Sequence, residues 1–132
     1  MTNESRRSPF SAHIGAEMEE LREGYARLSL VVGPQHTNPL GGMHGGVITT
    51  MMDSSLGAAL WALRGEEATR LPHATVEMNA SFLSGARAGD RIVVEGRVIR
   101  RGKSVAFGEA EARRNGEELI AKGRLTFAIR AD

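Results

Sequence analysis

Residues 38–63 read NPLGGMHGGVITTMMDSSLGAALWAL, and the arrangement of the rest of the chain depends on this stretch. Asn38-Pro39 and the glycines that follow favour a loop, because both residue types interrupt regular structure. From about Gly46 the pattern predicts a helix. Apolar or small residues occupy nearly every side of it, which is typical of a helix surrounded by other structure. We therefore expect a central core helix with Asp53 inside it.

Asp53 needs an explanation there, because an ionised carboxylate in apolar surroundings is costly unless it is paired, hydrogen-bonded or hydrated. Residues three and four positions apart share one face of a helix. Asp53 therefore lies on a narrow stripe of polar or glycine positions, namely Gly46, Thr49, Thr50, Asp53 and Gly57. We expect this stripe to line a small reaction pocket. The alternative is a structural carboxylate that accepts hydrogen bonds from Thr49, Thr50 or a neighbouring strand.

The start of the helix offers a second chemical feature. The backbone N–H groups of His44, Gly45 and Gly46 have no intrahelical partners, and glycine lets a ligand approach the backbone closely. Free N–H groups at the positive end of the helix dipole suit a developing oxyanion. A carboxylate about two turns further along, at Asp53, is then expected to direct a water molecule at the same carbonyl carbon.

The loop residues also have structural explanations, which stay open at this stage. His44 suits a hydrogen-bonding role that fixes the loop as well as a role in proton transfer. Gly46 suits close packing of helix against sheet. Asn38 before Pro39 is an ordinary turn pair.

Length and composition limit the possibilities. The chain has 132 residues, 41% of them hydrophobic, which predicts a single domain over residues 1–132 with a polar tail at about residues 1–8. A formal net charge of +1 gives no overall field for nucleic acid or an anionic membrane, so we expect neither as a partner. The absence of cysteine fits a reducing compartment, and we expect a cytoplasmic location. The four histidines are scattered, so we expect no metal site.

The remaining pattern predicts an α+β fold with an antiparallel sheet of five or six strands curled around the central helix. A short helical turn is expected at residues 9–14. Strands are expected at about residues 16–22, 25–32, 74–82, 92–98, 105 onward and 119–129, with an Asn115-Gly116 hairpin turn before the last. In the 74–82 strand, simple alternation puts Val76 and Met78 on the half-buried face and Thr75 on the opposite face.

This pattern resembles the hotdog fold, and specifically the PaaI-like acyl-CoA thioesterases. The likeness spans about residues 10–130. The residues that carry it are Asn38, Gly41 or Gly42, His44-Gly45-Gly46, Asp53, Thr75-Val76-Glu77-Met78 and Arg101-Gly102-Lys103.

The resemblance implies hydrolysis of an acyl-CoA thioester, without a cofactor, in a site shared by two subunits. It implies that the Gly45 N–H polarises the thioester carbonyl and that Asp53 of the facing subunit acts as base or nucleophile. Asn38 and Thr75 would orient the carbonyl or the attacking water. His44 is counted with these catalytic candidates, and Gly46 with the substrate-binding residues.

A basic corner at Arg100, Arg101 and Lys103 is either a solvated hairpin tip or a holder of the coenzyme phosphates. The shared site and the exposed strand edges predict a homodimer or a dimer-of-dimers tetramer. Two other functions stay open, a non-catalytic acyl-CoA binding or sensing protein and a hydratase acting on an enoyl thioester.

Overall fold

The structure, a computed structural model, describes residues 8–130. In these residues the elements follow in the order α1 (Pro9–Ile14), β1 (Glu17–Arg22), β2 (Tyr25–Val31), η2 (Pro34–His36), α2 (Gly45–Arg64), α3 (Glu67–Arg70), β3 (His73–Phe82), β4 (Arg91–Arg101), β5 (Val105–Arg114) and β6 (Glu118–Ile129). The 20-residue helix α2 begins one residue earlier than the sequence predicted. The short helical turn predicted at residues 9–14 is confirmed as α1.

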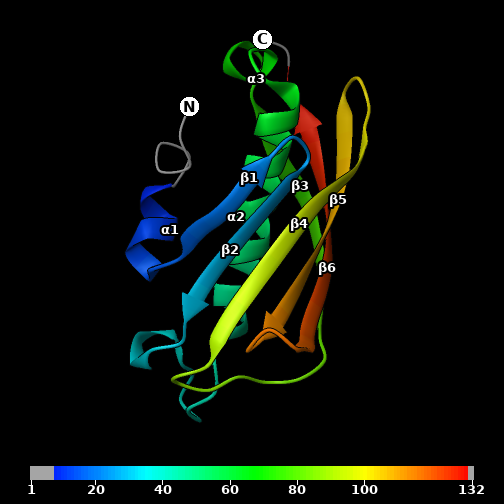
Figure 1. Cartoon of the computed structure of the whole chain (residues 1–132). Coiled ribbons are helices and arrows are strands. Elements are labelled where there is room, and N and C mark those ends of the chain that lie inside the picture. Colours follow the sequence, from blue (N-terminus) through cyan, green and yellow to red (C-terminus); the bar gives the residue numbers. More distant parts are fainter. Residues whose placement is uncertain (1–7, 131–132) are drawn as a thin grey trace.

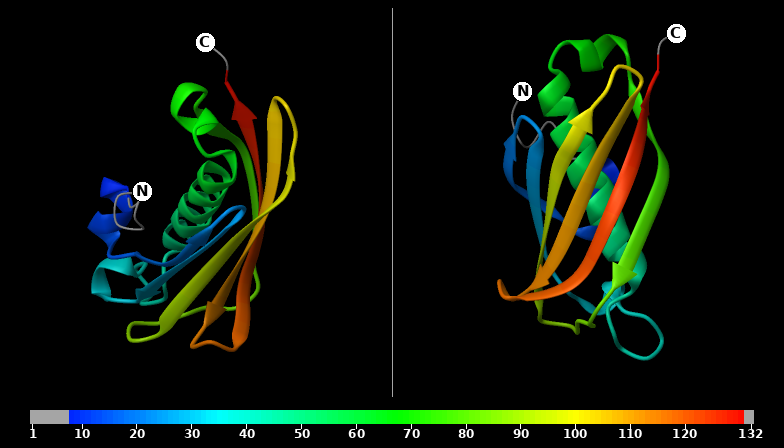
Figure 2. Two further views of the ribbon diagram at one scale, coloured as in Figure 1. Left: turned by 45° about the horizontal axis from the view of Figure 1, so that its top comes forward. Right: turned by 90° about the vertical axis from the view of Figure 1, so that its right-hand side faces the viewer.

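The strands form one six-stranded antiparallel sheet in the order β1-β2-β4-β5-β6-β3. The sheet curls, and α2 lies along its concave side (Figures 1 and 2). The Asn115-Gly116 turn before β6 has φ values of 51° and 79°, as a two-residue type I′ hairpin requires. The predicted curled sheet around one long helix is therefore confirmed, with β1 and β3 at its edges.

Helix α2 packs closely on the sheet because large side chains on the helix meet small residues on the strands. Met51, Met52, Leu56 and Leu60 are fully buried. The inward positions of β5 opposite them carry only small residues, which are Ala106, Gly108, Ala110 and Ala112. A Cβ atom at Gly108 would lie 2.5 Å from Leu56 Cδ2 and 3.2 Å from the Arg97 carbonyl oxygen. Glycine at 108 is therefore a packing requirement of the core.

Gly108→Ala is expected to lower the free energy of unfolding by about 1–3 kcal/mol, because the added methyl group overpacks a site where Leu56 has no room to move. Gly57→Ala is the matched control, since a Cβ at Gly57 has no heavy atom within 4 Å. Alanine inside a helix should raise the free energy of unfolding by about 0.5–1 kcal/mol. Urea unfolding of both variants measures the two values, and a stable Gly108→Ala protein would contradict the packing argument.

Strand β3 departs from regular alternation. Thr75 pairs with Phe127 and Glu77 pairs with Thr126, so Val76 is an extra residue in a β-bulge. The bulge reverses the side on which earlier residues lie, and Thr75 therefore shares the inward face with Met78. The prediction that Thr75 points away from the Met78 side is wrong for this reason. Val76, expected on the half-buried face, is 60% exposed.

No helix within residues 8–130 is both long enough and apolar enough to cross a membrane.

Candidate active site

The loop before α2 is held by hydrogen bonds that the sequence only partly predicted. The Asn38 side-chain oxygen accepts from the backbone N–H groups of Leu40, at 2.9 Å, and Gly42, at 3.2 Å. The Asn38 backbone N–H also donates to the Gly42 carbonyl oxygen at 2.7 Å. These bonds form a closed turn, so Asn38 shapes the loop in this chain whether or not it also orients a substrate.

His44 caps the N-terminus of α2. Its Nδ1 accepts a hydrogen bond from the Gly46 N–H at 2.8 Å, which fixes the loop-to-helix junction. An accepting Nδ1 puts the proton of the neutral ring on Nε2. The His44 N–H itself donates to the His36 carbonyl oxygen at 2.7 Å. The structural role considered for His44 is therefore present.

These bonds reduce the three expected free amides to one. Those of His44 and Gly46 are occupied. The Gly45 N–H, at the first helical position, has no hydrogen-bond acceptor among residues 8–130. It lies at the positive end of the α2 dipole, where a negative oxygen is favoured. Of these three, Gly45 is therefore the one whose N–H stays free of the described residues to donate to a ligand, and Gly46 is a capped helix residue.

Phe82 explains why position 45 is glycine. A Cβ atom built there would lie 3.1 Å from Phe82 Cζ, which is closer than ordinary van der Waals contact. The Phe82 ring is itself 50% exposed, so it can move. Close approach of the Phe82 ring to the helix start thus favours glycine at position 45.

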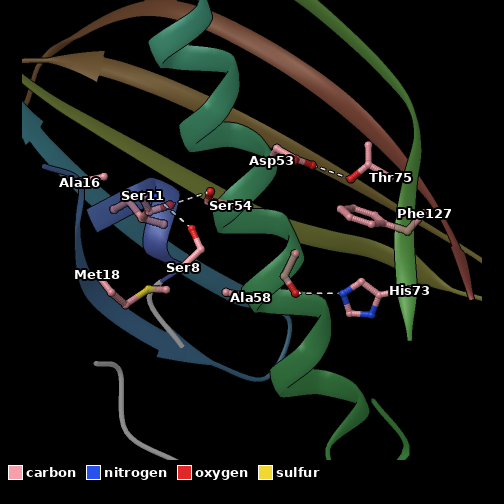
Figure 3. A pocket seen from close by; sticks show the side chains of 12 residues that line it. Ser8, Ser11, Ala16, Met18, Asp53, Ser54, Ala58, His73, Thr75 and Phe127 are labelled. Atoms are coloured by element: carbon pink, nitrogen blue, oxygen red, sulfur yellow. Dashed lines mark hydrogen bonds between the residues drawn. The ribbon is translucent and has the colours of Figure 1, made fainter. Parts of the chain in front are cut away.

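Asp53 lies on the exposed side of α2, in a cavity of about 240 Å³ between α1 and β3 (Figure 3). The Thr75 hydroxyl donates to Asp53 Oδ1 at 2.5 Å. Thr49 and Thr50 do not contact the carboxylate, because their hydroxyls donate to the Gly46 carbonyl oxygen. The expectation that Asp53 is sunk in apolar surroundings is wrong for the single chain, where its side chain is exposed. The small residues on this side of α2 face a cavity instead of a packed core.

Gly45 and Asp53 are too far apart to act on one carbonyl group within a chain. Eight residues separate them along α2, and at 1.5 Å per residue their backbone positions differ by about 12 Å. A carbonyl oxygen at the Gly45 N–H would leave its carbon out of reach of the Asp53 carboxylate of the same chain. Gly45 and Asp53 of the same chain therefore cannot act together on one carbonyl group, and the expectation that Asp53 acts from a facing subunit stays a prediction.

Thr75 lies beside Asp53, whereas Asn38 does not line the cavity that contains Asp53. Asn38 lines a different cleft together with Gly42, Arg87 and Arg114. That cleft belongs to the Gly45 end of α2, since the loop from Asn38 leads directly into the helix. Asn38 thus lies towards the Gly45 end of α2, and Thr75 lies beside Asp53.

The basic corner lies at the opposite end of α2 from Gly45. Arg101 forms an ion pair with Glu67, which also accepts from Arg64 Nε at 2.9 Å. The hydrogen bond from Arg101, followed by that from Arg64, lowers the pKa of the Glu67 carboxyl below its ordinary value. Arg100 and Lys103 are exposed and form no ion pair with the described residues. Of the three predicted phosphate contacts, Arg101 is therefore already engaged within the chain.

His73 is a cavity residue that sequence reasoning missed. Its Nδ1 accepts from Nη1 of the buried Arg64 at 2.7 Å, and its Nε2 lies 3.2 Å from the Gly57 carbonyl oxygen. Its ring lies edge-on to Phe127, with centroids 5.5 Å apart. The sequence did contain one indication of this position. His73 is two residues before Thr75, and residues two apart in a strand lie on the same face.

The far side of the cavity is closed by α1. The Ser11 and Ser54 hydroxyls are 2.9 Å apart and tie α1 to α2 (Figure 3). Met18 and Ala58 complete this side. Within residues 8–130, no group of three or more His, Asp or Glu side chains could hold a metal ion.

Comparison with known proteins gives a consistent result. A family model described as the thioesterase superfamily matches residues 40–121. Acyl-coenzyme A thioesterase 13 of Mus musculus is 37% identical over 97 residues, which are 72% of this chain and 66% of that protein. The chain thus spans just under two thirds of this curated relative.

Two solved structures are similar over nearly the whole chain. A conserved protein of Pseudomonas aeruginosa has a TM-score of 0.88 and 29% identity, covering 98% of this chain and 99% of that one. The E. coli PaaI protein has a TM-score of 0.86 and 19% identity, covering 97% and 88%. The chain therefore belongs to the thioesterase superfamily, and its fold is the PaaI-like hotdog fold.

Proposed function

We propose that this protein hydrolyses an acyl-CoA thioester to a carboxylic acid and coenzyme A, in a site shared by two copies of the chain. The observation that supports the proposal is that the two reactive groups lie far apart within one chain. One unoccupied amide, at Gly45, and one exposed carboxylate, at Asp53, lie about 12 Å apart on the same helix. Two copies related by a two-fold axis complete both sites, with Gly45 of one copy facing the partner's Asp53.

Strand β3 is the edge that we propose for this pairing. It carries Thr75 beside Asp53, and its outer edge has no neighbouring strand among residues 8–130. An unpaired strand edge is a ready template for another strand. Val76 and Leu83 near this edge are each 60% exposed. Pairing of two β3 strands would cover these side chains and set the two α2 helices antiparallel, as a dimer or as half of a dimer of dimers.

The Gly45 amide of one copy and the Asp53 carboxylate of its partner have different roles in the reaction. The Gly45 N–H donates to the thioester oxygen and stabilises the negative charge of the tetrahedral intermediate. The partner's Asp53 removes a proton from water as the water oxygen attacks, or attacks directly to form a mixed anhydride that water then hydrolyses. The C–S bond breaks, and the coenzyme leaves as a thiolate that takes up a proton. Thr75 donates to Oδ1, which leaves Oδ2 for the water.

The name of the mouse relative supports the choice of an acyl-CoA substrate. Arg100 and Lys103, as exposed cations without an ion pair to the described part of the chain, are the candidates to hold coenzyme phosphates. A thiol-release assay over a panel of acyl-CoAs tests the function. Release of free thiol with any of them supports hydrolysis. Tight binding by calorimetry without thiol release would instead support an acyl-CoA binding or sensing protein.

Mixing two inactive variants is expected to restore activity if the site is shared. Asp53→Asn removes the carboxylate, and Gly45→Pro removes the amide hydrogen. Random pairing in an equimolar mixture gives half the dimers one of each chain, and each mixed dimer has one intact site, so about a quarter of the wild-type activity should return. Co-refolding followed by the thiol-release assay measures this value.

The control for this mixture is each variant refolded alone. A mixture no more active than its components, with mixed dimers confirmed by two affinity tags, would contradict a shared site. A fully active monomer in sedimentation would contradict it as well.

A further inference from the structure

The packing of α2 does not explain why residue 57 is glycine. Gly57 lies in the interior of α2, where glycine destabilises a helix relative to alanine. The other glycines near α2 have packing reasons, since Cβ atoms at Gly96, Gly108 and Gly123 would come within 3.0 Å of helix side chains. A Cβ atom at Gly57 would meet nothing within 4 Å. The core therefore does not require glycine at this position.

The open space at Gly57 is the cavity that contains Asp53. Gly57 lies one turn beyond Asp53 on the same side of α2, and both line the cavity. His73 and Phe127 form one wall next to Gly57, and Met18 and Ala58 lie towards the other (Figure 3). Gly57 thus lies in the floor of a passage within this cavity that runs along α2 from the carboxylate.

We infer that Gly57 determines which acyl groups the site accepts, by leaving room for an acyl chain that extends past Asp53. The inference rests on the proposed acyl-CoA hydrolysis. Four residues of helix put Gly57 about 6 Å beyond Asp53, a distance that an extended chain of about five carbon atoms covers. Acetyl groups end before Gly57, whereas medium-length acyl chains pass over it. The predominantly carbon surfaces of Met18, Ala58 and Phe127 suit the apolar part of such a chain.

The test compares acetyl-CoA with octanoyl-CoA in the thiol-release assay. Wild-type protein is expected to have the higher kcat/KM with octanoyl-CoA. Gly57→Leu should lower the octanoyl-to-acetyl ratio of kcat/KM at least about tenfold, because its side chain fills the passage, and Gly57→Ala should give an intermediate ratio. Ala62→Leu is the matched control. It adds a leucine to the same helix at a half-exposed position that does not line the cavity, and it should leave the ratio unchanged.

Urea unfolding of each variant separates a changed passage from a damaged fold, and Gly57→Ala should be more stable than the wild-type protein. An unchanged ratio in a folded Gly57→Leu protein would overturn the inference, as would a wild-type preference for acetyl-CoA. A wild-type protein that releases no thiol would overturn the proposed function. Calorimetry still tests Gly57 in that case, because Gly57→Leu should weaken octanoyl-CoA binding at least about tenfold more than binding of free coenzyme A, and equal weakening would refute the role of Gly57.

Discussion

Asp53→Asn is expected to lower kcat about 10³-fold and to change KM little, because general base or nucleophilic catalysis by a carboxylate is worth about 10²–10⁴-fold. The amide of asparagine has nearly the same shape as the carboxylate but neither accepts a proton at neutral pH nor forms an anhydride. Its side-chain oxygen still accepts the Thr75 hydroxyl, which donates to Oδ1 in the wild-type protein. Asp53 is exposed in the single chain, so the free energy of unfolding should change little.

The matched control is Glu77→Gln. It makes the same chemical change on β3, two residues beyond Thr75, but on the outward face where Glu77 pairs with Thr126. Glu77→Gln should retain wild-type kcat in the thiol-release assay. Near wild-type turnover by a folded Asp53→Asn protein would remove Asp53 from the mechanism and leave the amide as the only chemical contribution of this helix.

The sequence predicted the architecture because each helix and strand is marked by a local pattern of residues. The unbroken run of mostly apolar and small residues after Gly46 predicted α2, and Asn115-Gly116 predicted the hairpin before β6. The prediction of the side on which Thr75 lies was wrong because side chains alternate strictly only in an unbroken strand. The β-bulge at Val76 moves Thr75 to the other face of the sheet, and no residue type in the strand signals it.

The site depended on tertiary detail that no local pattern contains. Asp53 was expected to be buried because the small residues around it in α2 were taken to pack against the core. In the structure two of them, Ser54 and Gly57, line a cavity instead. The residue pattern also left the amides of His44, Gly45 and Gly46 equivalent, and only the family resemblance pointed to Gly45. In the structure the His44 ring takes the Gly46 N–H and the His36 carbonyl oxygen takes the His44 N–H, which distinguishes the amide of Gly45 from the other two.

Gly45→Pro is the second change for which we expect a large effect, a loss of about 10²–10³-fold in kcat, as when one oxyanion donor is removed. Proline removes the amide hydrogen and puts a ring carbon in its place. The fold should tolerate it, because proline is favoured at the first helical position, where the N–H has no intrahelical partner. His44 already has φ −67° and ψ 128°, the extended backbone that proline requires of the residue before it.

Gly45→Ala is the control that isolates the hydrogen from the added bulk. Both variants bring a Cβ atom to about the position 3.1 Å from Phe82 Cζ, so both crowd the same ring, but alanine keeps the N–H. We expect Gly45→Ala to stay within about tenfold of the wild-type kcat and to exceed Gly45→Pro by at least about tenfold. Equal losses in the two variants, with both folded by circular dichroism, would assign the effect to crowding at Phe82 and would end the role of the Gly45 amide as the oxyanion donor.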